Sequence, residues 1–346
     1  MKLDSLQNMS TAVTDAVGSN AAAGLPSETN PPPGMEGQAK ASDTAQGTAF
    51  SASSLGKIVR MRALGPSEIP AHPELATLQI NSETPALDVF IKELLIEAEG
   101  FTTGYLPKNF NIKSKGKQSP PSIATVDLFT REIPMSELPK DARPSLGQRS
   151  AETWFARTSI HENVPKNGSA TWDEFDNGLR VNHSQNEKDY TPNIYDAHMV
   201  LDWTNEISKI TQSSDSMGGW ENLELRIMEM AHKIPPPLNN RVFPVMILTA
   251  RRASPAALIV VQVPVDTSKI STSKYCGGKG SKTTTGMYCS VEYCTLIESD
   301  SKVKWQMATA SDAKGSVPMW AQKMGVPGAV VKDVGLFIGW CAQQRK

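Results

Sequence analysis

The fold of this chain is decided by one stretch near its C-terminal end, GMYCSVEYCTLIESDSKVKWQMATAS, at residues 286–311. In its second half the apolar side chains Val303, Trp305 and Met307 lie two residues apart and alternate with polar ones. This period of two predicts a strand with one covered face. The first half is rich in β-branched and aromatic side chains. We therefore predict a second strand, joined to the other by a turn at 299–301.

A long helix is predicted after these strands. Ser316 can cap its first turn, and Gly325 and Pro327 are expected to break or kink it. Beyond this point apolar side chains recur on one helical face, at Val330, Val334, Phe337, Ile338 and Cys341. We therefore expect an α+β helix-grip fold, in which a curved antiparallel β-sheet wraps around the long C-terminal α-helix. Such an arrangement encloses a hydrophobic cavity between the sheet and the helix.

Composition excludes several classes of protein. The 346 residues include 35 basic and 36 acidic side chains, so the net charge of −1 gives no support for nucleic-acid binding. The N-terminal residues lack the cationic start and apolar core of a secretory signal. Four cysteines are too few for a disulfide scaffold, and we expect a cytoplasmic protein. Residues 1–50 have almost no large apolar side chains, which predicts a disordered segment.

Helices and strands are both predicted in the middle of the chain. Helices are expected at 87–98, at 172–188 with Thr171 as its cap, and at 220–232, and strands at 123–133, 154–161 and 194–203. A β-hairpin is expected at 241–265, with its turn at 252–255. The lysine-rich segment 103–121 is expected to be a solvated loop, which makes at most a transient contact with an anionic membrane.

Several motifs occur in a fixed order along the chain. They are WFARxSxH (154–161), WxEF (172–175), HxxxExxYxP (183–192), HxxPPPLxxRVF (232–243), YxSVE (288–292), WxMATASDAxGxVP (305–318) and KDV (332–334). Together they resemble the fungal DUF3074 family, which is similar to the START-like (helix-grip, Bet v 1-like) superfamily of lipid-binding proteins. The resemblance covers roughly residues 85–342. It implies a START-like domain at 85–346, a hydrophobic cavity under the C-terminal helix, and a fungal source.

The implied cavity is expected to be lined by the last two strands and the final helix. The candidate ligand-binding residues are Trp305, Met307, Tyr288, Glu292, Val330, Val334 and Phe337. Strand alternation groups Arg157 with Ser159 and His161 on one face, and parity leaves open which face looks inward. An inward-facing charge needs a partner. We therefore expect an arginine–glutamate pair in the cavity, formed by Glu292 with Arg157 or Arg241, where it would anchor a carboxylate or enol of a ligand, or else an ion pair at the edge.

The candidate catalytic residues are His183, Glu187, His161 and Arg157. His183 and Glu187 lie one helical turn apart, so they can share a face and form a hydrogen bond. A histidine that a carboxylate orients can transfer protons near neutral pH. The alternative, which we favour, is a structural network in which the same pair attaches the helix to the sheet.

No cofactor or metal ion is expected. The glycine-rich segment 277–286 lacks the spacing of a phosphate-binding loop, and the cysteines lack the pairs of a structural zinc site. The sequence therefore predicts a protein that binds a lipid or other hydrophobic small molecule, as a carrier or a sensor. The alternative is a pathway enzyme of fungal secondary metabolism, a Diels–Alder-like cyclase or pericyclase that folds a polyketide- or polyene-type substrate in the same cavity. The sequence leaves open whether the chain is an enzyme.

Overall fold

The structure is a computed structural model that describes residues 55–140, 152–210, 217–275, 283–314 and 319–345. The segment 1–50, expected to be disordered, and the expected helix cap Ser316 lie outside the described residues. All described residues belong to one compact unit, Ala49–Lys346. Leu55 is already buried in its core, ahead of the domain boundary expected at residue 85, and that boundary stays a prediction.

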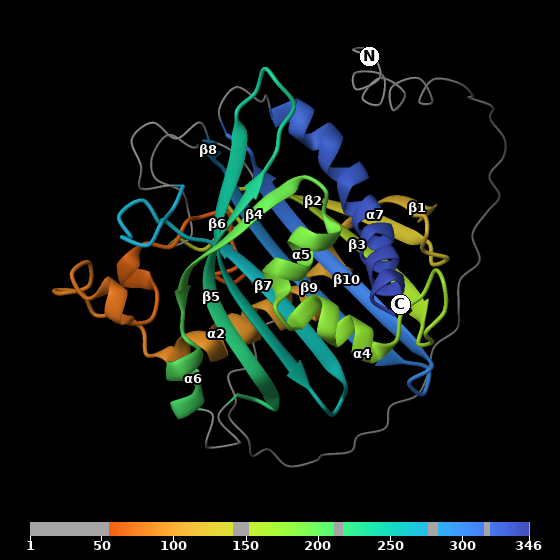
Figure 1. The fold of residues 1–346 in the computed structure, drawn as a ribbon, viewed down its shortest axis with the longest axis horizontal. Helices are drawn as coiled ribbons and strands as arrows, with labels where there is room; N and C mark the ends of the chain where they lie inside the picture. Colours follow the sequence, from red (N-terminus) through yellow and green to blue (C-terminus); the bar gives the residue numbers. More distant parts are fainter. Residues whose placement is uncertain (1–54, 141–151, 211–216, 276–282, 315–318, 346) are drawn as a thin grey trace, which may run out of the picture. The chain divides into compact units, whose positions relative to one another are not determined.

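One sheet runs through the described residues, and its main path is antiparallel (Figure 1). The strands are β1 (Asn111–Lys117), β2 (Val126–Ile133), β3 (Glu152–Glu162), β4 (Ile194–Asp202), β5 (Trp220–His232), β6 (Asn240–Arg252), β7 (Ala257–Pro264), β8 (Thr283–Thr285), β9 (Met287–Ile297) and β10 (Lys302–Asp312). They lie in the order β1-β2-β3-β10-β9-β7-β6-β5-β4, while β8 pairs in parallel with β6. The pairing of β9 with β10 confirms the two strands and the turn predicted at 286–311.

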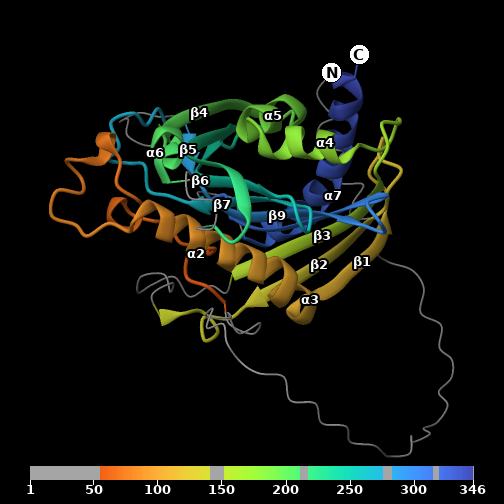
Figure 2. The ribbon, with the colours of Figure 1, turned by 90° about the horizontal axis from the view of Figure 1, so that it is seen from below.

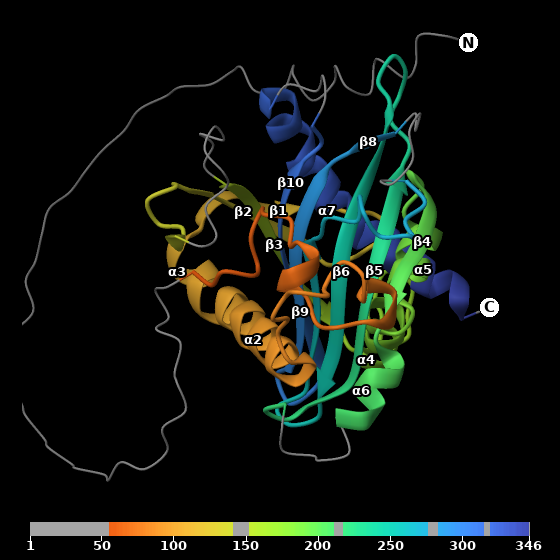
Figure 3. The same ribbon diagram turned by 90° about the vertical axis from the view of Figure 1, so that its left-hand side faces the viewer.

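Helices cover both faces of this sheet. They are η1 (Pro66–Glu68), η2 (Pro73–Leu75), α2 (Leu87–Gly100), η3 (Phe101–Tyr105), α3 (Leu106–Asn109), α4 (Trp172–Phe175), η5 (Asp176–Arg180), α5 (His183–Tyr190), α6 (Thr204–Ile210) and α7 (Met319–Gln344). α2 and α3 lie on one face, and α4, α5 and α7 lie on the other (Figure 2). Seen from the side of α2, α7 crosses behind the strands (Figure 3). The α+β class and the antiparallel sheet closed by the C-terminal helix are confirmed.

The central strands are buried on both faces, and each face has its own hydrophobic core. Met246 and Leu248 of β6 belong to the core under α2. Val245 and Ile247 of the same strand belong to the core under α7. A strand that is covered on both faces has a nearly continuous apolar sequence, which explains the long apolar runs of β6 and β7. The β-hairpin predicted at 241–265 is confirmed by their antiparallel pairing.

α7 closes the sheet through the predicted apolar stripe. The buried residues of the stripe are Val330, Val334, Phe337, Ile338 and Cys341. The helix continues without interruption through Gly325 and Pro327, so the expected break is wrong, while the alternative of a kink stays a prediction. Packing of the stripe stabilises the helix more than these two residues weaken it locally. Met324–Gln344 is also long and apolar enough to cross a membrane, and 33% of its most apolar window is buried inside the protein.

A close contact with the β1–β2 connection fixes the position of α7 on the sheet. Ser119 Oγ donates a hydrogen bond to the carbonyl of Val331 (2.7 Å) and accepts one from the N–H of Gly335 (2.8 Å). A Cβ atom at position 335 would lie 2.3 Å from the carbonyl oxygen of Pro120. Only glycine allows the helix to approach the connection this closely.

The segment predicted as a helix at 220–232 is the long strand β5, so this prediction is wrong. Its glutamate, leucine and methionine residues favour a helix in isolation. The buried side chains Leu223, Leu225 and Ile227 nevertheless recur every second residue, with the less buried Glu224 and Arg226 between them. β4 and β6 pair with β5 on its two sides and satisfy its backbone. Tertiary pairing therefore overrides the local preference of these residues.

Two further expectations need correction. The expected basic loop at 103–121 contains the strand β1, and its lysines lie on the outermost strand of the sheet, where charged side chains are common. The predicted helix at 172–188 begins at Thr171, which accepts a hydrogen bond from the N–H of Glu174 (3.2 Å). It is interrupted at Asn182, whose backbone adopts a left-handed conformation with φ of 49°. This interruption separates α4 and η5 from α5.

The packing of α7 leads to a first prediction. The buried ring of Phe337 contacts the rings of Phe175, Tyr190, Trp305 and Trp340. Phe337→Ala should therefore lower the free energy of unfolding by about 3–5 kcal/mol, measured by urea denaturation. Met324→Ala on the same helix is the control, because Met324 is 61% exposed and its loss should change stability by less than about 0.5 kcal/mol. Equal stabilities of the two variants would show that α7 does not close the sheet.

Candidate functional site

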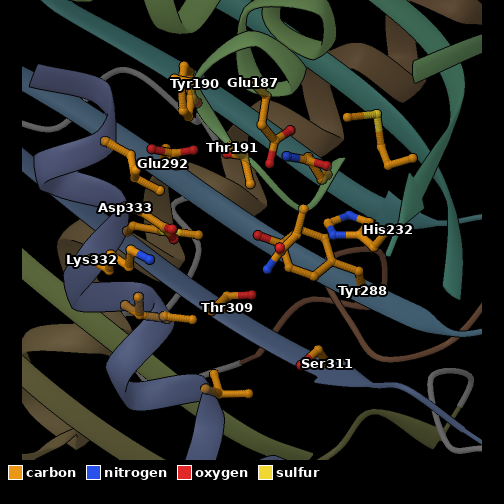
Figure 4. A pocket seen from close by; sticks show the side chains of 18 of the residues that line it. Glu187, Tyr190, Thr191, His232, Tyr288, Glu292, Thr309, Ser311, Lys332 and Asp333 are labelled. Atoms are coloured by element: carbon orange, nitrogen blue, oxygen red, sulfur yellow. The ribbon is translucent and has the colours of Figure 1, made fainter. Parts of the chain in front are cut away.

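A cavity of about 310 Å³ lies between α7, the end of α5 and the sheet. Its apolar wall includes Met230, Phe243, Trp305, Met307, Val330 and Leu336. Its polar wall includes Arg157, Glu187, Gln262, Glu292 and Asp333. Figure 4 shows carboxyl groups from α5, β9 and α7 around the same space. The cavity is therefore mostly apolar but carries an unusual number of charged groups.

The register of three strands brings an arginine and a glutamate together inside the protein. Arg157 on β3 and Glu292 on β9 both lie opposite Met307 on β10. Arg157 Nη2 lies 3.6 Å from Glu292 Oε2, and Arg157 Cζ lies 3.8 Å from the centre of the Trp305 ring. Trp305 Nε1 donates a hydrogen bond to the same carboxylate (2.8 Å). The ion pair expected from the sequence is present, and ion pairing and a cation–π contact stabilise the buried guanidinium.

His183 attaches α5 to the sheet. Its Nδ1 donates to the carbonyl of Leu179 (2.6 Å), so its Nε2 is the atom that accepts a hydrogen bond from the Gln262 amide on β7 (3.1 Å). Burial lowers the pKa of His183, so the ring is neutral at physiological pH. Glu187 Oε2 lies 3.5 Å from His183 Nε2 on the same helical face. His183 therefore makes the attachment of helix to sheet that we expected from the pair, whereas Glu187 Oε2 forms no hydrogen bond with a described residue.

Glu187 and Asp333 are the unusual acids of the cavity. Burial, together with the charges of Glu292 and Asp333, raises the pKa of Glu187 to about 8. Burial also raises the pKa of Asp333 to about 6. At neutral pH Glu187 is therefore mostly protonated, whereas Asp333 is mostly ionised. Within the described part of the chain, Glu187 Oε2 has no hydrogen-bond partner.

The histidine and tyrosine side chains of the cavity are neutral. Burial lowers the pKa of His232 to about 4, and its ring lies edge-on to Phe243 with 5.2 Å between the centroids. Burial raises the pKa of Tyr190 and that of Tyr288, so both hydroxyl groups stay protonated. These groups can donate or accept hydrogen bonds without adding charge.

The structure brings together part of the predicted ligand site. The expected residues that line the cavity are Trp305, Met307, Tyr288, Glu292 and Val330. Val334 and Phe337 do not line it, because they fill the hydrophobic core next to it. A role of Val334 and Phe337 in ligand binding therefore stays a prediction.

The four candidate catalytic residues separate into two groups. Arg157 and Glu187 line the cavity, whereas His183 and His161 do not. His161 Nε2 lies 2.8 Å from Ser159 Oγ, and its ring packs against that of Phe175. Burial and the charge of Arg157 lower the pKa of His161 to about 3. His161 is therefore a neutral core residue and lies away from any ligand in the cavity.

The sequence analysis did not identify the wall formed by β5, the end of α5 and the polar side of α7. The main residues missed there are Tyr190, Met230, His232 and Asp333. Met230 and His232 were missed because their strand was predicted to be a helix. Tyr190 and Asp333 lie in the motifs HxxxExxYxP and KDV, and their place in these motifs was the available signal.

No metal centre is found among the described residues, where no group of three or more histidine, cysteine, aspartate or glutamate side chains could hold an ion. The glycine-rich segment 277–286 lies mostly outside them.

Comparisons with known proteins identify a family. The family model described as "Protein of unknown function (DUF3074)" matches residues 154–341. No curated protein matches the chain.

Solved structures with a similar arrangement are human START domains. Human STARD10 has 11% identity and a TM-score of 0.44, with 71% of this chain and 80% of that chain covered. The human StAR-related lipid transfer protein 5 has 10% identity and a TM-score of 0.46, with 73% and 98% covered. The human StarD13 lipid transfer and protein localization domain has 13% identity and a TM-score of 0.39, with 70% and 94% covered. These similarities are too low to assign a ligand.

The raised pKa of Glu187 predicts how stability depends on pH. The pKa is 4.5 without the protein environment and about 8 in the folded state, so the folded state holds a proton that the unfolded state has lost. The contribution of Glu187 to the free energy of unfolding should therefore fall by about 1–2 kcal/mol as pH rises from 6.5 to 8. The lowered pKa values of His161, His183 and His232 act in the opposite direction at the lower end of this window, where unfolded histidines still lose protons, so the contribution of Glu187 is measured as the difference between the wild type and a Glu187 variant.

Urea denaturation at pH 6.5 and pH 8 measures this effect. Glu187→Gln should remove the contribution of Glu187 to the change in the free energy of unfolding between these two pH values. Asp189→Asn, which changes an exposed acid on the same helix, should leave that change as it is in the wild type. If Glu187→Gln and the wild type show the same change in the free energy of unfolding, Glu187 is not the protonated acid.

Proposed function

We propose that this chain, which belongs to the DUF3074 family, binds a lipid or other hydrophobic small molecule in the cavity under α7. The observation that supports this function is the cavity itself, which is enclosed between the sheet and α7 and lined largely by apolar and aromatic side chains. Removing apolar surface from water supplies the binding free energy. A few polar groups then fix the orientation of the ligand.

The size of the cavity limits the ligand. A volume of about 310 Å³ is at the lower end of the range of about 300–1,000 Å³ that small-molecule sites occupy. It suits a compact molecule with one short chain or one small ring system. A lipid with two long acyl chains would require the cavity to expand.

A carrier or a sensor is the function that we favour. We also propose a cytoplasmic location, with at most transient membrane contact through the lysines of β1. The cysteines in the described residues, Cys289, Cys294 and Cys341, are buried and free, in keeping with a reducing compartment.

A second function is favoured by one observation, the position of Glu187. A carboxylic acid with a pKa of about 8 that faces a cavity is suited to general acid–base catalysis near neutral pH. In a pathway enzyme Glu187 would protonate or deprotonate a bound substrate while the apolar wall holds it in a reactive conformation. The carrier function needs no such proton transfer.

A filled cavity should no longer bind an apolar probe. N-phenyl-1-naphthylamine, which fluoresces in apolar surroundings, should bind the wild-type protein saturably. Ala329 lines the cavity, so Ala329→Trp should weaken binding by about tenfold or more by filling space. Gly328→Trp is the control, since Gly328 is exposed on the same helix and its Cβ position has open space around it. Equal loss of binding in both variants would mean that the probe binds elsewhere.

Native mass spectrometry separates the carrier from the enzyme. The wild type and the Glu187→Gln variant are purified from the same host. The ligands that remain bound are extracted and identified by chromatography and mass spectrometry. A carrier should yield the same molecule from both proteins. An enzyme should yield its substrate from the variant and its product from the wild type. A cyclisation leaves the mass unchanged, so the two molecules are compared by chromatographic retention and fragmentation, and different molecules from the two proteins would contradict the carrier function.

A further inference from the structure

The cavity contains more acidic than basic groups. The charged groups that line it are Arg157, Glu187, Glu292, Lys332 and Asp333, and among them Lys332 is exposed to solvent. Arg157 already has a partner, because its guanidinium lies beside Glu292 and over the ring of Trp305. Two acids, Glu187 and Asp333, are therefore left without an ion pair inside the cavity, and the charges of Arg157 and Lys332 only partly offset the effect of burial on the pKa of Asp333.

Neither acid has a positively charged ion-pair partner in the part of the chain that the structure describes, and the side chain that hydrogen-bonds the Glu187 carboxyl is the neutral amide of Gln262. Glu187 Oε2 accepts no hydrogen bond, and its neighbour His183 is neutral because burial lowers its pKa. The carboxylate of Asp333 forms no hydrogen bond or ion pair with another described residue. Enclosing an acid without a partner costs free energy. Both side chains project into the same space, Glu187 from α5 and Asp333 from α7 (Figure 4), so one ligand group can serve both.

Arg157 contributes unused donors to the same cavity. Its side chain is 1% exposed, and in the described structure its Nε and Nη1 form no hydrogen bond. Because Glu292 already balances its charge, Arg157 is suited to donate to a neutral oxygen of the ligand. A carboxylate there would also face Glu292 and Asp333, and like charges at short distance repel. The position therefore favours a hydroxyl or carbonyl oxygen over an anion.

We propose that the ligand is a hydrophobic amine, bound with its protonated nitrogen at Glu187 and Asp333 and its apolar part against Met230, Phe243 and Met307. This inference rests on the proposed function, because it names the class of molecule that the cavity binds. The ammonium group replaces the proton of Glu187 and supplies the positive charge that both acids lack. The ring of Tyr288, which lines the same cavity, adds a surface that attracts cations.

Amine binding is coupled to the release of a proton. The charged and titratable groups around Glu187 are His183 and Tyr190 on α5, Arg157 on β3, His232 on β5, Tyr288 and Glu292 on β9, and Lys332 and Asp333 on α7. In the free protein at pH 7 Glu187 is mostly protonated, since its pKa is about 8. A bound ammonium group favours the ionised carboxylate. The affinity for an amine therefore rises between pH 6.5 and pH 8.5, where alkylamines themselves stay protonated.

Three matched probes test the ligand class. Decylamine, 1-decanol and decanoic acid have the same chain, and each competes with N-phenyl-1-naphthylamine for the cavity at pH 8. The amine should bind about 10- to 100-fold more tightly than the alcohol, as expected for hydrogen bonds to a charged group, and the acid should bind most weakly. Calorimetry of decylamine at pH 7, in two buffers with different heats of ionisation, should show release of close to one proton.

Variants assign the preference to the two acids. Glu187→Gln and Asp333→Asn should each lower the ratio of amine to alcohol affinity by about tenfold, while Asp189→Asn, exposed on α5, should leave the ratio unchanged. The ratio cancels any general loss of binding that a variant causes. Glu187→Gln should also abolish the proton release. If this variant does not fold, two measurements on the wild type still test the amine ligand. They are the proton release on decylamine binding and the rise of decylamine affinity with pH.

The outcomes separate this inference from the proposed function. Tighter binding of decanoic acid than of decylamine, or equal binding of all three probes, would overturn the amine ligand and leave hydrophobic binding in place. Amine preference without proton release, and unchanged in both acid variants, would also overturn it. If neither the fluorescent probe nor any decyl compound binds, the proposed function fails as well.

Discussion

The burial of the Arg157–Glu292 pair is the constraint on which the cavity side of the protein depends. Removing two charges from water costs free energy, and this cost is partly offset when the two charges lie together. Here the pair needs three strands in one register, because both residues lie opposite Met307. A shift of β3 by one residue would turn Arg157 toward the core under α2. Trp305 completes the arrangement with its ring face and its Nε1.

The parts of the fold that the sequence predicts are those with a local period. One example is the strand with Val303, Trp305 and Met307 on one face, and another is the helix with the apolar stripe around Phe337. Each pattern shows which face becomes covered, so the strand and the helix can be predicted without knowing which elements pack against them. β5 was not predicted, because its residues favour a helix and only pairing with β4 and β6 makes the strand. The interruption at Asn182 likewise depends on a single backbone conformation that no apolar pattern reveals.

The site was predictable only in part, for a related reason. A helical stripe shows which side chains are buried, but not which of them border empty space. Val330 and Phe337 share the stripe, yet Val330 lines the cavity whereas Phe337 fills the core. His183 and Glu187 lie one turn apart, yet the first bonds to Gln262 and the second faces the cavity. These differences follow from how α5 and α7 are positioned over the sheet, which depends on contacts such as that between Ser119 and Gly335.

The unpaired acids of the cavity link ligand binding to stability. Raised pKa values at Glu187 and Asp333 mean that the free protein would be more stable with neutral residues at these positions near pH 8. Such groups concentrate where a protein acts on another molecule. A ligand that compensates both acids and binds the folded state only adds stability that grows with the logarithm of its concentration over its dissociation constant. The cost of the empty site is then recovered when the site is filled, and a sensor can use that difference in stability as its signal.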